Sequence, residues 1–194
     1  ALVYGMGRSP DGRLLLSGGV DRRVVVWDLA RSQPLVVVEA HRERIRELRF
    51  LGDSRQFATR SWDGTVKVWR LDPGVAPVEG VGHTDRIFTL DVARHGGLFA
   101  TVSADRTVRI WDGRTAKLRH TLRGHTNKVR CVTLSPQGDR VASGGWDQTV
   151  RLWSTRTGQA LHVLQGHPTR VSAVAWSPDG RRVATADSKG ELRL

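Results

Sequence analysis

Short runs of hydrophobic residues, separated by polar turn residues, recur along the whole chain. In residues 86–93 the apolar Phe88, Leu90 and Val92 alternate with polar side chains, and further runs cover residues 98–103, 107–111 and 117–122. These runs are rich in Val, Ile, Phe, Thr and Trp and are bounded by Gly, Pro, Asp and Ser, which is typical of β-strands; none has the pattern of a long amphipathic helix. Because the connections are short, antiparallel neighbours are favoured. The pattern predicts an all-β fold made of groups of four antiparallel strands, the fourth being the most variable (residues 35–39, 75–80, 117–122 and 159–164).

The groups repeat with a period of 42 residues. Four types of residue keep this spacing without insertion: Trp27, Trp69, Trp111 and Trp153; His41, His83, His125 and His167; Asp21, Asp63, Asp105 and Asp147; and Ser17, Thr59, Thr101, Ser143 and Thr185. A fixed period of this length indicates that the fold is assembled from one repeated supersecondary unit.

The spacing of the Gly-His and Trp-Asp pairs resembles that of the WD-repeat family. Gly82-His83 with Trp111-Asp112 is the full signature, and Gly124-His125 with Trp153 is a close match. The resemblance implies a β-propeller whose blades are four-stranded antiparallel sheets. Dividing 194 residues by 42 yields about 4.6 blades, whereas members of the family usually close with seven. We therefore expect residues 1–194 to be a segment of a larger propeller, with repeats ending at Trp27, Trp69, Trp111 and Trp153 and a truncated fifth ending at Leu194. Further blades of the same chain, or self-association, would close it.

Histidine, aspartate and a hydroxyl residue recur together, which raises the possibility of a hydrolase. The combination occurs in several near-equivalent copies, whereas an enzyme needs one site. The resemblance implies instead a structural tetrad in each blade, a buried hydrogen-bond chain from indole to carboxylate. The three tetrads are His41, Thr59, Asp63 and Trp69; His83, Thr101, Asp105 and Trp111; and His125, Ser143, Asp147 and Trp153. The fifth repeat has Lys189 at the aspartate position. No catalytic residue, metal site or cofactor is predicted, because the other histidines are isolated and no phosphate-binding loop occurs.

The chain carries 31 basic and 19 acidic residues, for a net charge of +12. This excess favours an acidic partner, either nucleic acid or protein, although an arginine bias can also reflect the base composition of a genome. No apolar stretch approaches the roughly 20 residues that cross a membrane, so no membrane partner is expected. The single Cys131 favours a reducing compartment, and we predict a cytoplasmic protein.

In WD-repeat proteins, positions at the start of the first strand and before the turn aspartate tend to face the partner-binding entrance of the central channel. The matching residues form a set that is basic and aromatic, which we call the entrance-face cluster: Arg44, Arg46, Trp62, Arg86, Phe88, Lys128, Arg130, Trp146 and Arg170. Tryptophan and arginine often dominate interface energies, so we predict a non-catalytic scaffold that binds an acidic protein or peptide there. The alternatives are nucleic-acid binding through the same face, a role as the sensor arm of a larger signalling NTPase, kinase or protease, or tryptophans that only pack on neighbouring loops.

Overall fold

The computed structural model describes residues 2–72, 78–80, 82–94 and 97–194. Within these residues every regular element is a β-strand, and the strands form five antiparallel sheets, or blades, in sequence order. The all-β fold and the antiparallel blades predicted from the sequence are confirmed. None of the described residues belongs to a helix that could span a membrane.

Each of the first four blades contains four strands in the order of the chain, and the fifth contains three. The first two blades are β1 (Val3–Arg8), β2 (Leu14–Gly19), β3 (Arg23–Asp28) and β4 (Gln33–Glu39), then β5 (Ile45–Phe50), β6 (Gln56–Ser61), β7 (Val66–Arg70) and β8 (Val78–Gly80). The third and fourth are β9 (Ile87–Val92), β10 (Leu98–Ser103), β11 (Val108–Asp112) and β12 (Leu118–Leu122), then β13 (Val129–Leu134), β14 (Arg140–Gly145), β15 (Val150–Ser154) and β16 (Ala160–Leu164). The fifth is β17 (Val171–Trp176), β18 (Val183–Asp187) and β19 (Leu192–Arg193). Residues 75–77 of the predicted fourth strand of the second blade lie outside the described residues.

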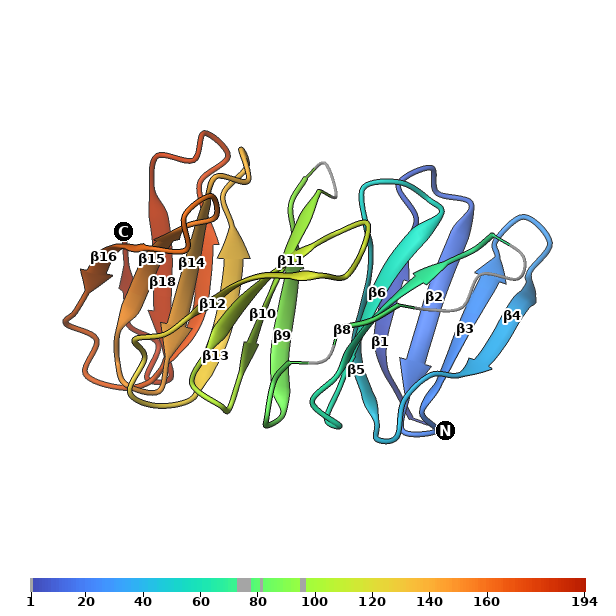
Figure 1. Cartoon of the computed structure of the whole chain (residues 1–194), viewed down its shortest axis with the longest axis horizontal. Helices are drawn as coiled ribbons and strands as arrows, with labels where there is room; N and C mark the ends of the chain where they lie inside the picture. The colour runs from blue at the N-terminus through green and yellow to red at the C-terminus, as the bar shows by residue number, and fades with distance from the viewer. Residues whose placement is uncertain (1, 73–77, 81, 95–96) are drawn as a thin grey trace.

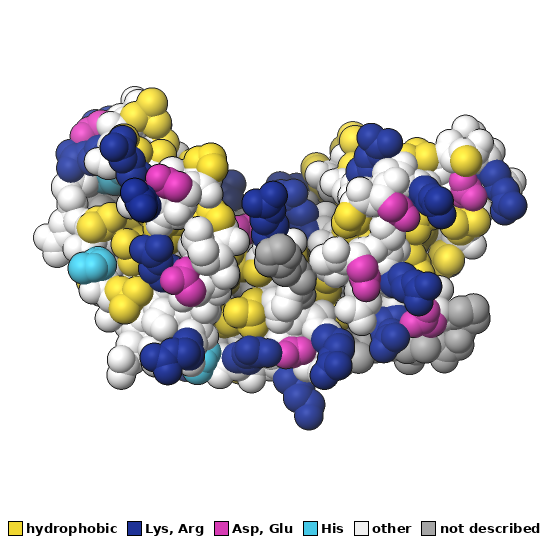
Figure 2. All heavy atoms as spheres, turned by 90° about the horizontal axis from the view of Figure 1, so that it is seen from above, with side chains coloured by type: hydrophobic (Ala, Val, Ile, Leu, Met, Phe, Trp, Pro, Cys, Tyr) yellow, Lys and Arg dark blue, Asp and Glu magenta, His cyan; other side chains and the backbone are white. Residues whose placement is uncertain are grey.

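The blades stand side by side in an arc, with both ends of the chain at the ends of the arc (Figure 1). The first strand of each blade packs against the first strand of the next, so β1, β5, β9, β13 and β17 line the inner side. Seen from above, the molecule is a crescent with a notch between its two arms rather than a closed ring (Figure 2). The fold is therefore a partial propeller.

The hydrophobic core lies between the blades. Leu16, Val24 and Val26 of the first blade form one fully buried cluster with Ile45 and Leu48 of the second, and equivalent clusters join each later pair of blades. Full burial of an Ile or Leu side chain contributes roughly 1.5 to 3 kcal/mol, so the stability of each blade depends on its neighbour.

Candidate interaction face and the polar chains behind it

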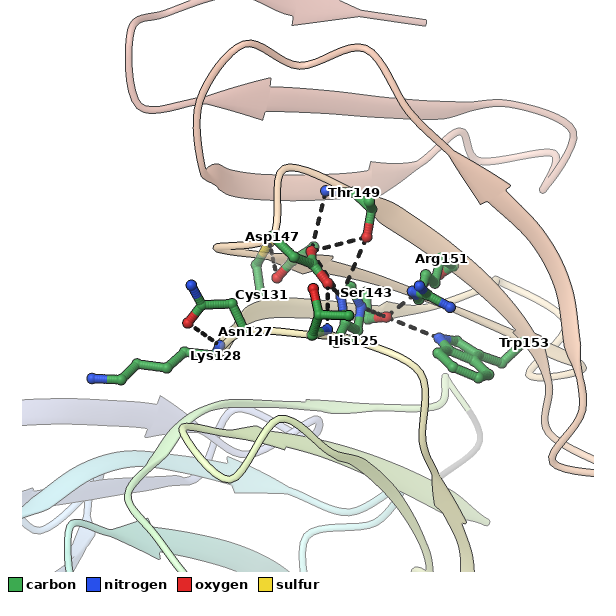
Figure 3. Close-up of polar contacts among 11 residues, drawn as sticks. His125, Asn127, Lys128, Cys131, Ser143, Asp147, Thr149, Arg151 and Trp153 are labelled. Carbon is green, nitrogen blue, oxygen red and sulfur yellow. Dashed lines mark hydrogen bonds and ion pairs between the residues drawn. The ribbon is translucent and has the colours of Figure 1, made fainter.

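A buried chain of hydrogen bonds crosses the fourth blade (Figure 3). The indole Nε1 of Trp153 on β15 donates to Ser143 Oγ on β14 at 2.9 Å, and Ser143 Oγ lies 2.9 Å from Nε2 of His125. The other ring nitrogen, Nδ1, lies 2.8 Å from Oδ2 of Asp147 in the turn between β14 and β15, and it donates because a carboxylate can only accept. Ser143 is fully buried and already bonded on two sides. A substrate therefore has no access to this hydroxyl.

The second and third blades contain the same chain. In the third, Trp111 Nε1 donates to Thr101 Oγ1 at 2.8 Å, Thr101 lies 2.8 Å from His83 Nε2, and His83 Nδ1 lies 2.7 Å from Asp105 Oδ2. In the second, the indole–hydroxyl, hydroxyl–imidazole and imidazole–carboxylate distances are 2.9, 2.7 and 3.0 Å, through Trp69, Thr59, His41 and Asp63. The carboxylate also accepts backbone and hydroxyl hydrogen bonds from the residue two positions later, Thr65 or Thr107, which shapes the turn.

These surroundings shift the pKa of both ends of the chain. Burial raises the pKa of Asp63, Asp105 and Asp147, but hydrogen bonds from the imidazole and the nearby threonine outweigh burial, so each pKa lies below its usual range. Burial lowers the pKa of His83 more than the neighbouring Asp105 raises it. The neutral His83 ring therefore donates from Nδ1 to the carboxylate and accepts the Thr101 proton at Nε2.

The first and fifth blades depart from this pattern. In the first, the Trp27 indole donates to Ser17 Oγ at 2.8 Å, whereas Asp21 is exposed. In the fifth, His167 Nε2 lies 2.8 Å from Thr185 Oγ1, but its Nδ1 has no hydrogen-bond partner among the described residues and lies 3.9 Å from Asp187 Oδ2. Asp187 lies two residues before Lys189, at a position of the 42-residue repeat that is occupied by Gly or Ser in the other blades. The sequence did not predict Asp187, because the position that holds the turn aspartate in the other repeats is occupied by Lys189.

The entrance-face cluster lies where the inner strands begin, and its aromatic rings are in contact with its cations. The guanidinium carbons of Arg44, Arg46 and Arg86 lie 4.6, 5.2 and 4.9 Å from the centre of the Trp62 ring. Arg46 also lies 4.3 Å from the ring of Tyr4, the first-blade residue at the position that matches Arg46 in the 42-residue repeat. Cations from two blades therefore surround one half-buried tryptophan.

The same arrangement recurs further along the arc. Lys128 Nζ and the Arg170 guanidinium lie 5.1 and 5.2 Å from the Trp146 ring, and the Arg130 guanidinium lies 5.5 Å from the Phe88 ring. None of the six cations of the cluster has an ion pair with a carboxylate in the described part of the chain. Each ring thus holds cations in place without neutralising them.

A buried ion pair within the second blade also makes hydrogen bonds to the third blade, and it was not predicted from the sequence. Glu47 Oε2 accepts hydrogen bonds from Arg60 Nε at 3.1 Å and from the Leu90 backbone N–H at 3.2 Å, while Arg60 Nη1 donates to the Ile87 carbonyl at 2.8 Å. Burial lowers the pKa of Arg60 to about 10. One feature of the sequence could have indicated this pair: Arg60 occupies a position of the 42-residue repeat that holds Gly, Val or Ala in the other four blades.

The family model for the WD domain, G-beta repeat, matches residues 1–28, 32–70, 78–112, 116–154 and 158–194, so the chain belongs to the WD40 repeat family. This confirms the resemblance inferred from the Gly-His and Trp-Asp pairs and supports a role as a protein–protein interaction scaffold. Over 58 residues the chain is 40% identical to the transcriptional corepressor LEUNIG_HOMOLOG of Arabidopsis thaliana. The aligned stretch covers 30% of this chain and 7% of that relative.

Proposed function

We propose that this WD40 array is a non-catalytic scaffold whose entrance-face cluster binds an acidic segment of a protein partner. The observation that carries the proposal is the group of six cations held against Trp62, Phe88 and Trp146 with no carboxylate partner in the described structure. Carboxylates of a partner could pair with guanidinium groups that the rings already orient, at a reduced entropic cost. The name of the corepressor relative adds support for a protein partner.

The same contacts favour an acidic peptide over single-stranded nucleic acid. Base stacking needs an open aromatic face, whereas the Trp62 ring is in contact with three guanidinium groups and the Trp146 ring with two cations. A base would have to displace these cations before it could stack. A location in the cytoplasm and a place beside a signalling enzyme domain remain predictions.

Fluorescence anisotropy with a labelled decaglutamate peptide and with an oligo(dT) of about 15 nucleotides tests the proposal. We expect saturable peptide binding that weakens roughly tenfold in the triple variant Arg44→Gln, Arg46→Gln and Arg86→Gln. The matched control changes three exposed arginines on other loops, Arg114, Arg156 and Arg181, to Gln and should have a small effect. If peptide binding weakens equally in both triple variants, the affinity depends on net charge alone and not on the entrance-face cluster. Tighter binding of oligo(dT), with a steep loss of affinity between about 50 and 200 mM salt, would favour nucleic acid instead.

We also propose that residues 1–194 form part of a larger propeller. Val3 and Met6 of the first blade are 55% and 69% exposed, whereas their equivalents in the second blade, Ile45 and Leu48, are 0% and 1% exposed because the first blade covers them. An apolar face of this kind fits the packing face of another blade, from the same chain or from a second copy. The isolated chain should therefore associate, and Met6→Glu should reduce the association. A stable, monodisperse 21.5 kDa species in light scattering would refute this.

A further inference from the structure

A second basic site lies at the opposite end of the inner strands from the entrance-face cluster. There a pocket of about 340 Å³ opens where β1, β5 and β9 end, and Arg8, Arg49 and Arg94 from three successive blades line it. Figure 2 looks onto this face and shows basic side chains gathered at the notch of the crescent. The pocket is therefore separate from the face assigned to the protein partner.

Much of the hydrogen-bonding capacity of the three guanidinium groups is unused. Arg94 is exposed and its side chain makes no hydrogen bond or ion pair with another described residue. Arg49 uses its Nε for Glu47 Oε1 at 3.2 Å, so that both terminal nitrogens remain, and Arg8 makes only long hydrogen bonds of 3.3 and 3.4 Å to the Gly12 carbonyl. These donors are available to a ligand.

Asp91 is the one carboxylate that lines the pocket. Its Oδ2 accepts hydrogen bonds from the Leu134 backbone N–H at 2.8 Å and from Thr133 Oγ1 at 3.2 Å, both in the fourth blade. The side chain thus bridges two blades, and its burial raises the pKa of the carboxyl group. Asp91 offsets one positive charge at most, and Glu47, which pairs with Arg49, is shared with Arg60, so the pocket and its surroundings keep a net positive charge.

The repeat shows that these arginines are not needed to build the blades. Arg8, Arg49 and Arg94 each occupy a different position of the 42-residue frame. The equivalents of Arg8 are Phe, Val, Leu and Trp, those of Arg49 are Gly, Asp, Thr and Ala, and those of Arg94 are Pro or Gly. Residues that a blade requires recur at one frame position, as the tetrads do. The three arginines meet only because the arc brings their blades together.

We propose that this pocket binds a compact anion that carries two or more phosphate or carboxylate groups. A guanidinium group pairs with either group through two parallel hydrogen bonds, and three arginines around one pocket can hold a doubly or triply charged ligand. A pocket of about 340 Å³ has room for a compact anion such as pyrophosphate or citrate.

Isothermal titration calorimetry with pyrophosphate and with citrate tests the assignment. We expect saturable one-to-one binding, about tenfold weaker for each single change among Arg8→Gln, Arg49→Gln and Arg94→Gln, and lost in the triple variant. The control set at Arg114, Arg156 and Arg181 should retain binding to within about threefold, as should the entrance-face triple variant. Tryptophan fluorescence and thermal unfolding verify that each variant is folded.

Sedimentation with phosphatidylcholine vesicles containing phosphatidic acid identifies the source of the anion. Vesicle binding that requires the three arginines would assign the site to a lipid headgroup, and binding of pyrophosphate or citrate alone would assign it to a soluble anion. Absence of saturable binding to all of these probes, or equal weakening in the pocket and control triple variants, would overturn the proposal.

Discussion

Replacement of Asp105 by alanine tests whether the buried polar chains stabilise the blades. The Asp105 carboxylate accepts four hydrogen bonds: from His83 Nδ1 at 2.7 Å, from the Thr84 backbone N–H at 3.2 Å, and from the Thr107 backbone N–H and hydroxyl at 2.9 and 2.7 Å. In the variant, water can reach the exposed Thr84. It does not reach the His83 side chain, which is 0% exposed, or the buried Thr107. Thr107 Oγ1, 3.3 Å from His83 Nδ1, can accept the imidazole proton, but the buried Thr107 backbone N–H then has no partner.

The expected loss follows from this difference. An unsatisfied buried donor costs about 1 to 3 kcal/mol, and exposed donors that find water cost little, so Asp105→Ala should lower the free energy of unfolding by about 2 kcal/mol. For a chain of this length that corresponds to a fall in Tm of roughly 4 to 8 °C. Circular dichroism and tryptophan fluorescence during thermal unfolding measure it.

The first blade offers a matched control. Asp21 occupies the same frame position, but it is exposed, and the hydrogen bond found for its carboxylate is a 3.3 Å contact from the Arg23 backbone. Asp21→Ala should therefore change stability by less than about 0.5 kcal/mol. If the two variants lose the same stability, or if Asp105→Ala leaves Tm unchanged, the hydrogen-bond argument is refuted.

Three further predictions concern buried charges and close packing. Glu47→Gln should lower the free energy of unfolding, measured with urea, by about 3 kcal/mol, because it leaves Arg60 charged and buried without its carboxylate. Changing both residues to apolar ones should recover much of that loss, and a Glu47→Gln variant with unchanged stability would contradict the idea. Folding lowers the pKa of His83 from 6.5, so below that pH the unfolded chain binds more protons than the folded chain. The urea midpoint of unfolding should therefore fall as the pH drops from about 7 to 5. A midpoint that does not change with pH would count against a neutral buried imidazole. Gly145→Ala should lower the free energy of unfolding by more than about 2 kcal/mol, since the added Cβ would lie 2.5 Å from Asp147 Oδ1 and 2.6 Å from His125 Nδ1. Gly97→Ala has open space and should be tolerated, so equal Tm values for the two variants would disprove the steric argument.

The periodic part of this protein could be predicted from the sequence. Every interior blade contacts its neighbours in the same way, so the same residue is needed every 42 positions, and Trp111, His83 and Asp105 mark one blade as clearly as their counterparts mark the others. The strand ranges, the antiparallel order and the family followed from that regularity, because strands and tight turns depend on residues close together in the chain.

Only the tertiary structure revealed the features that occur once. Glu47 and Arg60 pair at a blade boundary, Asp187 lies near His167 from outside the expected frame position, and the three arginines of the anion pocket come from three different frame positions. A periodic pattern carries no information about such contacts, because their residues do not recur from blade to blade. Glu47 and Arg60 face each other on neighbouring strands of one blade, whereas the three arginines come together across the arc. The sequence by itself therefore determined the blades, and the tertiary structure decided which charged side chains meet within a blade and between neighbouring blades.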